Sequence, residues 1–388
     1  MKNNRKIRIV ISLHEFYEAG SAYELRNFLL ENYKADMLFI SHPLLLRKES
    51  YNFSSRYEYF KDSILIKKNN AFHWVLPEPF LYIKDFLYTL IWTIFIGQKY
   101  DLFFGYNPLD AFCGILLRSI GRVKKVVYYN IDFTPIRFQN KILDYIYHLF
   151  DKYAAYYADL NWVGTKRTIK ARINYGLSLK RMAKTIIVPD GNHSLRIKQK
   201  KSSQVKKENI VYLGGIYKKQ GIDLIIEALP KLNKLIKGLE FTVIGDGEYL
   251  DTLKEKVKSL KLNNVRFLGY IEDLFKVEDI LTSSGIAVAP YLPDKNSFTY
   301  YSDPGKPKWY LACGLPVIIT NVPAIAEVIE RRKAGKMINY DKEELIKAVL
   351  EIMHKGNYEE YRKNSRKMGL SFDWSIIFKK ALSQTLRI

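Results

Sequence analysis

Apolar and polar positions follow a repeated order along the chain: a short apolar run, a turn, and then a longer segment with helical periodicity. In the first half, the apolar runs predict strands at residues 7–13, 37–41, 63–67, 100–106, 125–130, 160–163 and 185–188. The segments between them predict helices at about residues 21–33, 80–96, 108–120, 140–158 and 166–175. Alternation of this kind is typical of a parallel sheet with helices on both faces.

The apolar pattern lapses between Pro189 and Glu208, in PDGNHSLRIKQKKSSQVKKE, and then restarts. After it, strands are predicted at residues 210–213, 240–244, 265–268, 286–289, 315–319 and 336–338, and helices at 222–236, 249–260, 342–354 and 372–388. We therefore expect an α/β protein with a Rossmann-like domain at 1–190, a linker at 191–207 and a second Rossmann-like domain at 208–371. Ligands of such sheets bind beyond the C-terminal strand ends, so a cleft between the domains is the expected site.

The stretch 302–320, SDPGKPKWYLACGLPVIIT, combines a constrained loop, a short helix, a turn and a buried strand. Proline restricts the backbone, so the helix is predicted to start near Pro307. Unpaired N–H groups, the positive end of the helix dipole and Lys306 then lie together, which suits a diphosphate. The alternative is an ordinary surface helix capped by Asp303 or Ser302.

Composition adds a charge argument. Hydrophobic residues make up 48% and charged residues 26% of the chain, which is ordinary for a globular protein, but the formal net charge is +22. Such a charge favours anionic partners: nucleic acid, acidic lipid or phosphorylated small molecules. Nucleic acid is the weaker interpretation, because the chain has no zinc spacing, RNA-binding segment or basic region leading into heptads.

The segment Phe80–Ile96 is rich in apolar and aromatic residues, yet its uninterrupted part, Phe86–Ile96, is too short to span a bilayer. Two interpretations stand: a buried core helix, which is the default, and a helix lying in a membrane interface. The basic N-terminus leads straight into a strand pattern, so no signal peptide is predicted. Cys113 and Cys313 form no metal pattern, which favours a reducing compartment. We expect a cytoplasmic protein, with peripheral contact at the inner face of the membrane as an open option.

Several segments in a fixed order carry a family resemblance: IVYLGGIYKKQGIDLIIEAL, FTVIGDGEYL, VRFLGYIED, GIAVAPY and LACGLPVI, with VPDGNH before them and FDWSIIFKKAL after them. Together they resemble the retaining sugar-nucleotide glycosyltransferases of the two-domain GT-B architecture, in the large family numbered four. The resemblance implies transfer of a sugar from a nucleotide-diphosphate sugar to a hydroxyl of a glycan or lipid-linked glycan, with retention, as in polysaccharide biosynthesis. It also implies that the helix at 372–388 crosses back onto the first domain.

The resemblance implies a donor site in the second half. In the family, an Arg and a Lys after the Gly-Gly turn hold the diphosphate, but Gly215 and Gln220 occupy those positions here. Lys218, Lys219 and Lys306 are the implied substitutes. The full implied donor-binding set is Gly20, Gly214, Gly215, Lys218, Lys219, Tyr270, Ile271, Pro304, Gly305 and Lys306.

The implied catalytic residues depart further from the family. Tyr301 and Trp309 stand where two glutamates are usual, so Asp303 is the substitute expected at the donor sugar. A first-domain histidine has no clear counterpart. Asp132, after the strand at 125–130, is expected to orient the donor or accept the acceptor's proton; the alternative, which the sequence favours slightly, is a turn-forming residue before Pro135. His14, at the end of the first strand, is the other polar candidate.

No Asp-x-Asp pair occurs in the chain, and the histidines show no ligand spacing. We therefore expect neither a metal nor another cofactor, with lysines and a helix N-terminus neutralising the diphosphate. Two alternatives remain open at this point. One is a sugar-nucleotide epimerase or hydrolase of the same fold; the other is a non-catalytic basic binding protein.

Overall fold

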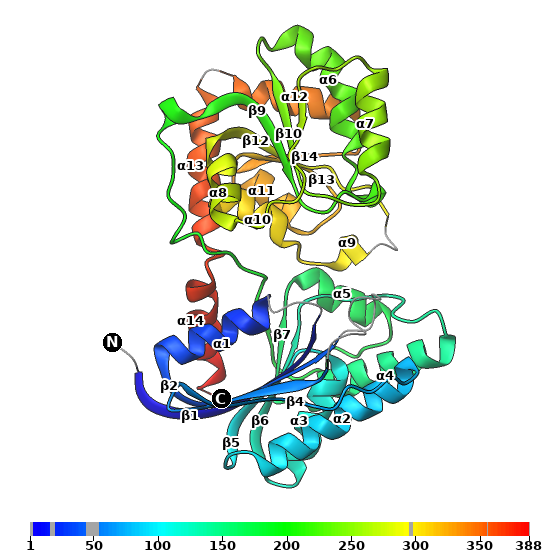
Figure 1. Cartoon of the computed structure of the whole chain (residues 1–388), viewed down its shortest axis with the longest axis vertical. Helices are drawn as coiled ribbons and strands as arrows, with labels where there is room; N and C mark the ends of the chain where they lie inside the picture. Colours follow the sequence, from blue (N-terminus) through cyan, green and yellow to red (C-terminus); the bar gives the residue numbers. More distant parts are fainter. Residues whose placement is uncertain (1–2, 16–19, 44–53, 295–297, 355, 388) are drawn as a thin grey trace. The chain divides into compact units, whose positions relative to one another are not determined.

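The computed structural model describes residues 3–15, 20–43, 54–294, 298–354 and 356–387. The chain forms two compact units (Figure 1). Unit 1 comprises residues 1–189 and 378–388, and unit 2 comprises residues 190–377. Each unit contains one open sheet covered by helices, as the alternation of apolar runs and helical segments predicts. The predicted cleft between the domains stays a prediction.

The sheet of unit 1 has eight strands in the order β4-β3-β2-β1-β5-β6-β7-β8. Its strands are β1 (Asn3–Glu15), β2 (Tyr33–Pro43), β3 (Arg56–Lys61), β4 (Ile64–Asn70), β5 (Tyr100–Gly105), β6 (Val123–Asn130), β7 (Leu160–Val163) and β8 (Thr185–Ile187). All neighbours pair in parallel except at one edge, where β3 is antiparallel to both β2 and β4. The sequence pattern missed β3, and with it the antiparallel edge.

A two-residue turn makes this edge antiparallel. Asp62 and Ser63 connect β3 to β4 with φ angles of 50° and 68°. Two successive residues with positive φ fit the twist of a hairpin, and Asp tolerates that conformation better than most side chains. The hairpin therefore makes β3 and β4 antiparallel, whereas a crossover through a helix would make them parallel.

Three of the five helices that the structure describes wholly within unit 1 begin at a residue whose side chain caps the first turn. The five helices are α1 (Ser21–Asn32), α2 (Glu78–Phe95), α3 (Pro108–Ser119), α4 (Lys141–Tyr157) and α5 (Lys166–Asn174). The side chains of Asn107, Asn140 and Thr165 accept hydrogen bonds from the first turns of α3, α4 and α5. All five helices were predicted from the sequence, with ends shifted by a few residues at most.

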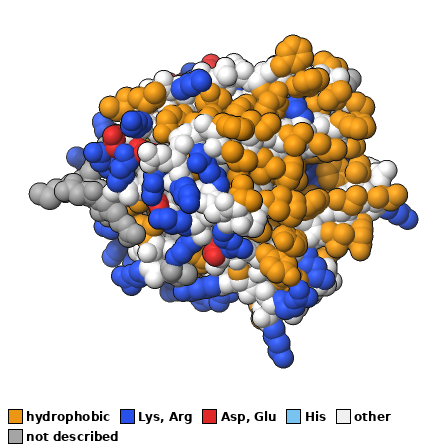
Figure 2. All heavy atoms as spheres, turned by 90° about the horizontal axis from the view of Figure 1, so that it is seen from below, with side chains coloured by type: hydrophobic (Ala, Val, Ile, Leu, Met, Phe, Trp, Pro, Cys, Tyr) orange, Lys and Arg blue, Asp and Glu red, His pale blue; other side chains and the backbone are white. Residues whose placement is uncertain are grey.

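Helix α2 does not have the environment of a buried core helix, which was the default prediction. Its buried row is Leu81, Asp85, Thr89 and Thr93, so mostly polar side chains face the unit. Its exposed row is apolar, with Phe80 at 57% and Ile83 at 56% exposure. Figure 2 shows apolar side chains gathered over a broad area of one face, with Lys and Arg side chains around it. In the described part of the chain, no helix is long and apolar enough to cross a bilayer.

The sheet of unit 2 has six parallel strands in the order β11-β10-β9-β12-β13-β14. Its strands are β9 (Lys206–Leu213), β10 (Glu240–Ile244), β11 (Val265–Phe267), β12 (Ser284–Ala289), β13 (Val317–Thr320) and β14 (Gly335–Ile338). Successive residues of β9 enter different cores: Ile210 and Tyr212 contribute to one apolar cluster and Val211 to another. Because both faces are covered, the strands are continuous apolar runs in the sequence.

The helices of unit 2 cover both faces of its sheet. They are α6 (Asp223–Leu235), α7 (Leu250–Ser259), α8 (Leu274–Ser283), α9 (Phe298–Tyr301), α10 (Gly305–Ala312), α11 (Ile325–Arg331), α12 (Lys342–Met353) and α13 (Asn357–Leu370), with short 3-10 turns η2 (Ser202–Gln204) and η3 (Lys218–Gln220). Side chains of α6, α7 and α12 join the cluster that contains Ile210, and side chains of α8, α10 and α11 join the cluster that contains Val211.

The last helix, α14 (Trp374–Thr385), starts in unit 2, and its residues from Phe378 onward belong to unit 1. In unit 1, the ring of Phe378 lies 5.8 Å from that of Phe28, and Trp162 Nε1 donates to Thr385 Oγ1 at 3.1 Å. The chain therefore returns to its first unit at its C-terminal helix.

The predicted linker, residues 191–207, lies within unit 2 rather than between the units. Ile197 and Val205 are buried in the cores of that unit. The Asn192 side chain donates to the backbone oxygens of Lys308 at 3.0 Å and Gly369 at 3.3 Å. Polar side chains therefore anchor this segment, which is why its apolar pattern lapses although it is ordered.

Candidate functional site

Three loops of unit 2 lie side by side where β9, β10 and β11 end. The backbone N–H of Gly214 donates to Ile244 O at 2.9 Å, and that of Gly245 donates to Gly269 O at 2.8 Å. A Cβ atom on Gly245 would lie 2.1 Å from Gly214 O, so only glycine allows this approach. The backbones of these loops are thus closely spaced at the C-terminal strand ends, where ligands of α/β sheets bind.

Helix α10 begins beside these loops without a side-chain cap. It starts at Gly305, two residues before the predicted Pro307, and its N-cap residue is Pro304. Among the described residues, no side chain caps it, so the alternative of an ordinary cap by Asp303 or Ser302 is wrong. The N–H groups of the first turn and the positive end of the helix dipole are therefore left for another partner.

Lys306 lies in the first turn of α10 and reaches across to the β9 loop. Its Nζ donates to Tyr212 Oη at 2.8 Å and to Gln220 Oε1 at 2.7 Å. The same atom lies 4.2 Å from the ring centroid of Tyr212 and 5.2 Å from that of Tyr291. A Cβ on Gly214 would lie 2.9 Å from Lys306 Cε, so the glycine makes room for the lysine.

The Lys306 ammonium has only neutral partners. Burial lowers the pKa of Lys306 from 10.5 to about 7. In the part of the chain that the structure describes, no carboxylate lies within ion-pair distance of it. A cation of this kind would gain most from an anionic ligand, because the anion restores the electrostatic partner that the protein does not supply.

Asp303, predicted at the donor sugar, is instead held in a buried ion pair. Its Oδ2 lies 2.5 Å from Lys308 Nζ and accepts the backbone N–H of Asp190 at 2.7 Å. Lys308 Nζ also donates to Asp190 O at 2.9 Å. Asp303 and Lys308 are both buried. This pair attaches the start of α10 to the segment that opens unit 2, and so positions Lys306.

The remaining donor-site candidates of unit 2 follow the ends of β9 and β11. Lys218 and Lys219 lie in η3 and are exposed, with Lys219 Nζ 6.0 Å from the Tyr217 ring centroid. Tyr270 is 77% exposed, whereas Ile271 packs against the core. Strand order places these segments at the same edge of the sheet as Gly214. Gly215, also exposed, faces the ring of Tyr217.

Two candidates belong to unit 1. Gly20 has a φ of 102° and is the N-cap residue of α1, and a Cβ there would meet no atom within 4 Å. Asp132 follows β6 and is partly exposed. Both residues therefore lie at strand ends of the first sheet, as the sequence pattern indicates, but at different strands.

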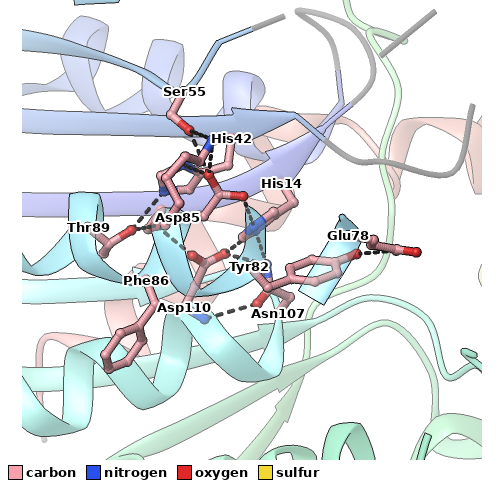
Figure 3. Close-up of polar contacts among 12 residues, drawn as sticks. His14, His42, Ser55, Glu78, Tyr82, Asp85, Phe86, Thr89, Asn107 and Asp110 are labelled. Atoms are coloured by element: carbon pink, nitrogen blue, oxygen red, sulfur yellow. Dashed lines mark hydrogen bonds and ion pairs between the residues drawn. The ribbon is translucent and has the colours of Figure 1, made fainter. Parts of the chain in front are cut away.

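The sequence pattern missed most of a buried polar cluster in unit 1 (Figure 3). We call it the histidine cluster; its members are His14, His42, Asp85 and Asp110. His14 and His42 are register partners at the ends of β1 and β2, Asp85 comes from α2 and Asp110 from the first turn of α3. His14 Nε2 lies 3.3 Å from Asp85 Oδ2, and His14 Nδ1 lies 3.4 Å from Asp110 Oδ2. His42 Nδ1 lies 3.2 Å from Asp85 Oδ1.

The charges of the histidine cluster stabilise one another. Burial alone lowers the pKa of His14, but the charges and hydrogen bonds of Asp110 and Asp85 outweigh burial and raise it to about 9. Burial alone raises the pKa of Asp85, but His42 and His14 outweigh it and hold that pKa well below its usual range. The side chain of His14 is only 4% exposed. The cluster is therefore internally paired, and His14 does not present its ring to a ligand.

Lys84, whose Nζ lies 2.8 Å from Asp85 Oδ1, and several neutral groups complete the cluster. Ser12 Oγ donates to Asp110 Oδ1 at 2.8 Å and Ser55 Oγ donates to Asp85 Oδ1 at 2.7 Å. His42 Nε2 lies 2.8 Å from Thr89 Oγ1. Only His14 had been singled out from the sequence, because the others are far apart along the chain. Among the residues that the structure describes, no group of three or more His, Cys, Asp or Glu could hold a metal ion.

Comparison with known proteins gives a family for unit 2. Residues 207–355 match the family model described as Glycosyl transferases group 1. Over 274 residues, 66% of this chain and 70% of the relative, the chain is 23% identical to an uncharacterized 41.2 kDa protein in the cps region of Klebsiella pneumoniae. Over 161 residues it is 23% identical to the phosphatidyl-myo-inositol mannosyltransferase of Mycolicibacterium smegmatis, covering 41% of this chain and 39% of that relative.

Solved structures give the fold. Sucrose-phosphate synthase from Thermosynechococcus elongatus matches with a TM-score of 0.71 at 16% identity, over 98% of each chain. HepE of Anabaena in complex with UDP-glucose matches with a TM-score of 0.64 at 15% identity, over 98% of this chain and 100% of that one. The fold is therefore GT-B, and residues 207–355 form a glycosyl transferases group 1 domain.

Proposed function

Because the chain is a glycosyltransferase, we propose that it transfers a sugar from a nucleotide-diphosphate sugar to a hydroxyl of a glycan or lipid-linked glycan, with retention and without a metal. Unit 2 binds the donor, and its diphosphate occupies the start of α10. Solved relatives of the same fold were crystallised with UDP or UDP-glucose, so a uridine donor is the first to test.

The observation that carries this proposal is the Lys306 ammonium. It lies in the uncapped first turn of α10 and bonds only to the neutral Tyr212 and Gln220. The sequence resemblance implies a diphosphate-binding lysine at position 220, where this chain has Gln. Gln220 Oε1 lies 2.7 Å from Lys306 Nζ. Lys306 therefore supplies a positive charge close to position 220, where the implied lysine is missing.

Chemistry at the leaving group follows from this geometry. When the bond between the sugar and the diphosphate breaks, negative charge develops on the leaving oxygen. Preorganised N–H groups of α10 and the Lys306 ammonium would stabilise that charge without reorganisation. In this proposal these groups neutralise the leaving diphosphate in place of a metal ion.

Acceptor chemistry belongs to unit 1 in this proposal. Asp132, partly exposed after β6, is assigned to orient the donor sugar or to accept the proton of the acceptor hydroxyl. Asp303 is assigned a positioning role through Lys308, in place of the direct sugar contact expected from the sequence. Both cysteines are free and buried, in keeping with a reaction in the reducing cytoplasm.

The test is donor binding and turnover by the wild type and Lys306→Met. A panel of nucleoside diphosphates and their sugars is screened by thermal shift, since a ligand at a hundredfold its Kd adds about 2.7 kcal/mol to stability. Loss of a charge-assisted contact should weaken donor binding about thirtyfold in Lys306→Met. A matched control is Lys276→Met, an exposed lysine of α8, which should bind the donor as the wild type does.

Turnover separates the remaining alternatives. Acceptor-dependent release of the nucleotide, unaffected by EDTA, supports the metal-independent transfer reaction, and the anomeric configuration of the product by NMR tests retention. Nucleotide release without any acceptor would instead support a hydrolase or epimerase. Equal donor responses of the wild type and Lys306→Met would refute the assignment of the phosphate site.

A further inference from the structure

We propose that unit 1 docks onto a bilayer that contains anionic lipid, through an apolar face formed by residues 71–77, α2 and α4. This inference is independent of the donor site, because it rests on the surface of unit 1 alone. The exposed apolar residues of the face are Phe72, Trp74, Val75, Leu76, Phe80, Ile83, Leu87, Ile91, Ile94, Phe95, Ile142, Tyr145, Ile146, Leu149, Tyr153 and Tyr157.

Helix α2 is inverted relative to an ordinary surface helix. Its exposed apolar residues recur at intervals of three and four, at positions 80, 83, 87, 91 and 94, and so form one stripe. Its inner row carries Asp85, Thr89 and Thr93, which are buried. A surface helix normally turns its apolar stripe toward the core. The polar inner row instead serves the histidine cluster, which leaves the apolar stripe for an outside partner.

Helix α4 repeats the same arrangement on neighbouring surface. Ile142, Ile146 and Leu149 are 71%, 40% and 46% exposed, on a stripe that Tyr153 and Tyr157 continue. Ala154 and Ala155, by contrast, lie in the core of unit 1. Two helices of unit 1 thus expose apolar stripes. Single exposed apolar residues are normal on a protein surface, but two apolar stripes require an explanation.

Aromatic contacts make these pieces one continuous surface. Trp74 Nε1 donates to Tyr88 Oη at 3.2 Å and joins residues 71–77 to α2. Phe112 of α3 lies between the helices, with ring centroids 5.9 Å from Phe86 of α2 and 5.0 Å from Phe150 of α4. The broad apolar area in Figure 2 is consistent with this continuity. Contiguous apolar surface of this extent marks an interaction site.

The distribution of charged residues around the apolar face indicates which partner it binds. Residues 86–98, FLYTLIWTIFIGQ, contain no charged side chain, so the centre of the face is apolar. Exposed lysines lie on its elements or next to them: Lys67 and Lys68 on β4, Lys99 after α2 and Lys141 at the start of α4. An apolar surface with a basic border fits the interface of an anionic bilayer, where apolar side chains enter the acyl boundary and lysines contact headgroups.

A second copy of this chain fits the same face less well. A symmetric contact would bring two identical basic borders together, in a protein with a formal net charge of +22. An anionic bilayer removes that repulsion and replaces it with attraction. The proposal therefore commits to lipid, and self-association becomes an outcome that the test can detect.

The experiment is flotation of the full chain with large unilamellar vesicles of phosphatidylcholine, with or without one quarter phosphatidylglycerol, at low and high salt. We expect the wild type to float with the anionic vesicles, less so at high salt, and to stay largely unbound with pure phosphatidylcholine. Leu87→Glu and Ile91→Glu should each weaken partitioning about tenfold or more, because a charge enters the apolar centre. Leu235→Glu, at an exposed apolar position of unit 2, should partition as the wild type does.

Two further readouts keep the result unambiguous. Trp74, 44% exposed in the face, should be quenched by lipids with brominated acyl chains, and this quenching should decrease in Trp74→Phe, which keeps the partly buried Trp92 of α2. Donor-induced thermal shift should be unchanged in Leu87→Glu, which shows that the variant folds. The proposal is overturned if the wild type ignores anionic vesicles or if Leu87→Glu binds them equally. It is also overturned if sedimentation without lipid shows a wild-type dimer that Leu87→Glu dissociates.

Discussion

The two units differ in how the charged side chains at the C-terminal ends of their strands are paired. In unit 1, the histidine cluster at the ends of β1 and β2 pairs each buried charge with another, as in the contacts of His14 with Asp85 and Asp110. In unit 2, Lys306 has only the neutral Tyr212 and Gln220 as partners, and its pKa falls to about 7. At the strand ends of unit 1 the buried charges are therefore balanced within the protein. At the strand ends of unit 2 the charge of Lys306 has no counterion in the described part of the protein.

The same difference recurs within a single helix. Lys306 and Lys308 are two residues apart on α10, but Lys308 has the Asp303 carboxylate 2.5 Å away. A buried charge with a counterion belongs to the structure, because removing its partner leaves an uncompensated charge. A charge such as that of Lys306, which is partly buried and has no counterion, lowers stability and gains from a ligand that provides one. The comparison therefore separates Asp303 and Lys308, which stabilise the structure of the site, from Lys306, which is available to bind an anion.

The largest expected effect is on folding, from Lys308→Met. The substitution leaves the buried Asp303 without its cation, so the free energy of unfolding should fall by about 3–5 kcal/mol. Urea unfolding at pH 7 measures this. Lys306→Met, the same change two residues earlier, should leave the stability unchanged or raise it, because it removes a charge without a counterion. An equal loss in both variants would contradict the distinction between the two lysines.

The histidine cluster should make stability depend on pH. The folded-state pKa of His14 is about 9 and thus above its ordinary value of 6.5. The resulting stabilisation is complete below pH 6.5 and is lost as the pH rises through 9; its size is about 3 kcal/mol. Urea unfolding between pH 6 and 9.5 should show this decline in the wild type and not in His14→Gln. The exposed His73→Gln serves as control and should follow the wild type.

The affinity for the donor should also depend on pH, but through a group whose pKa is lowered, Lys306, and not through one whose pKa is raised. Free Lys306 loses its proton near pH 7, and a bound diphosphate favours the charged form. Affinity for a sugar nucleotide should therefore fall above pH 7, by up to about tenfold per pH unit. Titration calorimetry with UDP-glucose is suitable, because its diphosphate keeps its charge throughout this range. Lys306→Met should bind weakly with a flat profile, and an equal slope in that variant would assign the proton to another group.

Local periodicity was enough to predict most of the fold. Helices such as α4 and strands such as β7 depend on apolar spacing and caps within a few residues, so the sequence indicates them directly. A strand overlapping β4 was predicted, but β3 and the turn between them were missed, because Asp62 and Ser63 adopt positive φ without glycine. The segment at 191–207 looked like a linker because its anchoring groups are polar.

The site was predictable only in part, for a related reason. Lys306 lies between Pro304 and Pro307, and these prolines indicate a helix start close to it. Tyr212 and Gln220, its partners, come from β9 and η3, and no local pattern connects them to it. The histidine cluster likewise joins β1, β2, α2 and α3, which only the sheet order brings together. Charge pairing across elements is a tertiary property, and spacing along the chain does not encode it.

The smallest expected effects come from Lys218→Ala and Lys219→Ala. Both lysines are exposed, and exposed charges contribute little because water screens them. Each substitution should weaken UDP-glucose binding by less than about fivefold, with a reduced dependence on salt, against about thirtyfold for Lys306→Met. Calorimetry at two salt concentrations distinguishes the contributions. A loss at Lys218 or Lys219 as large as that at Lys306 would move the phosphate from the start of α10 to η3, and the unpaired ammonium would then need another explanation.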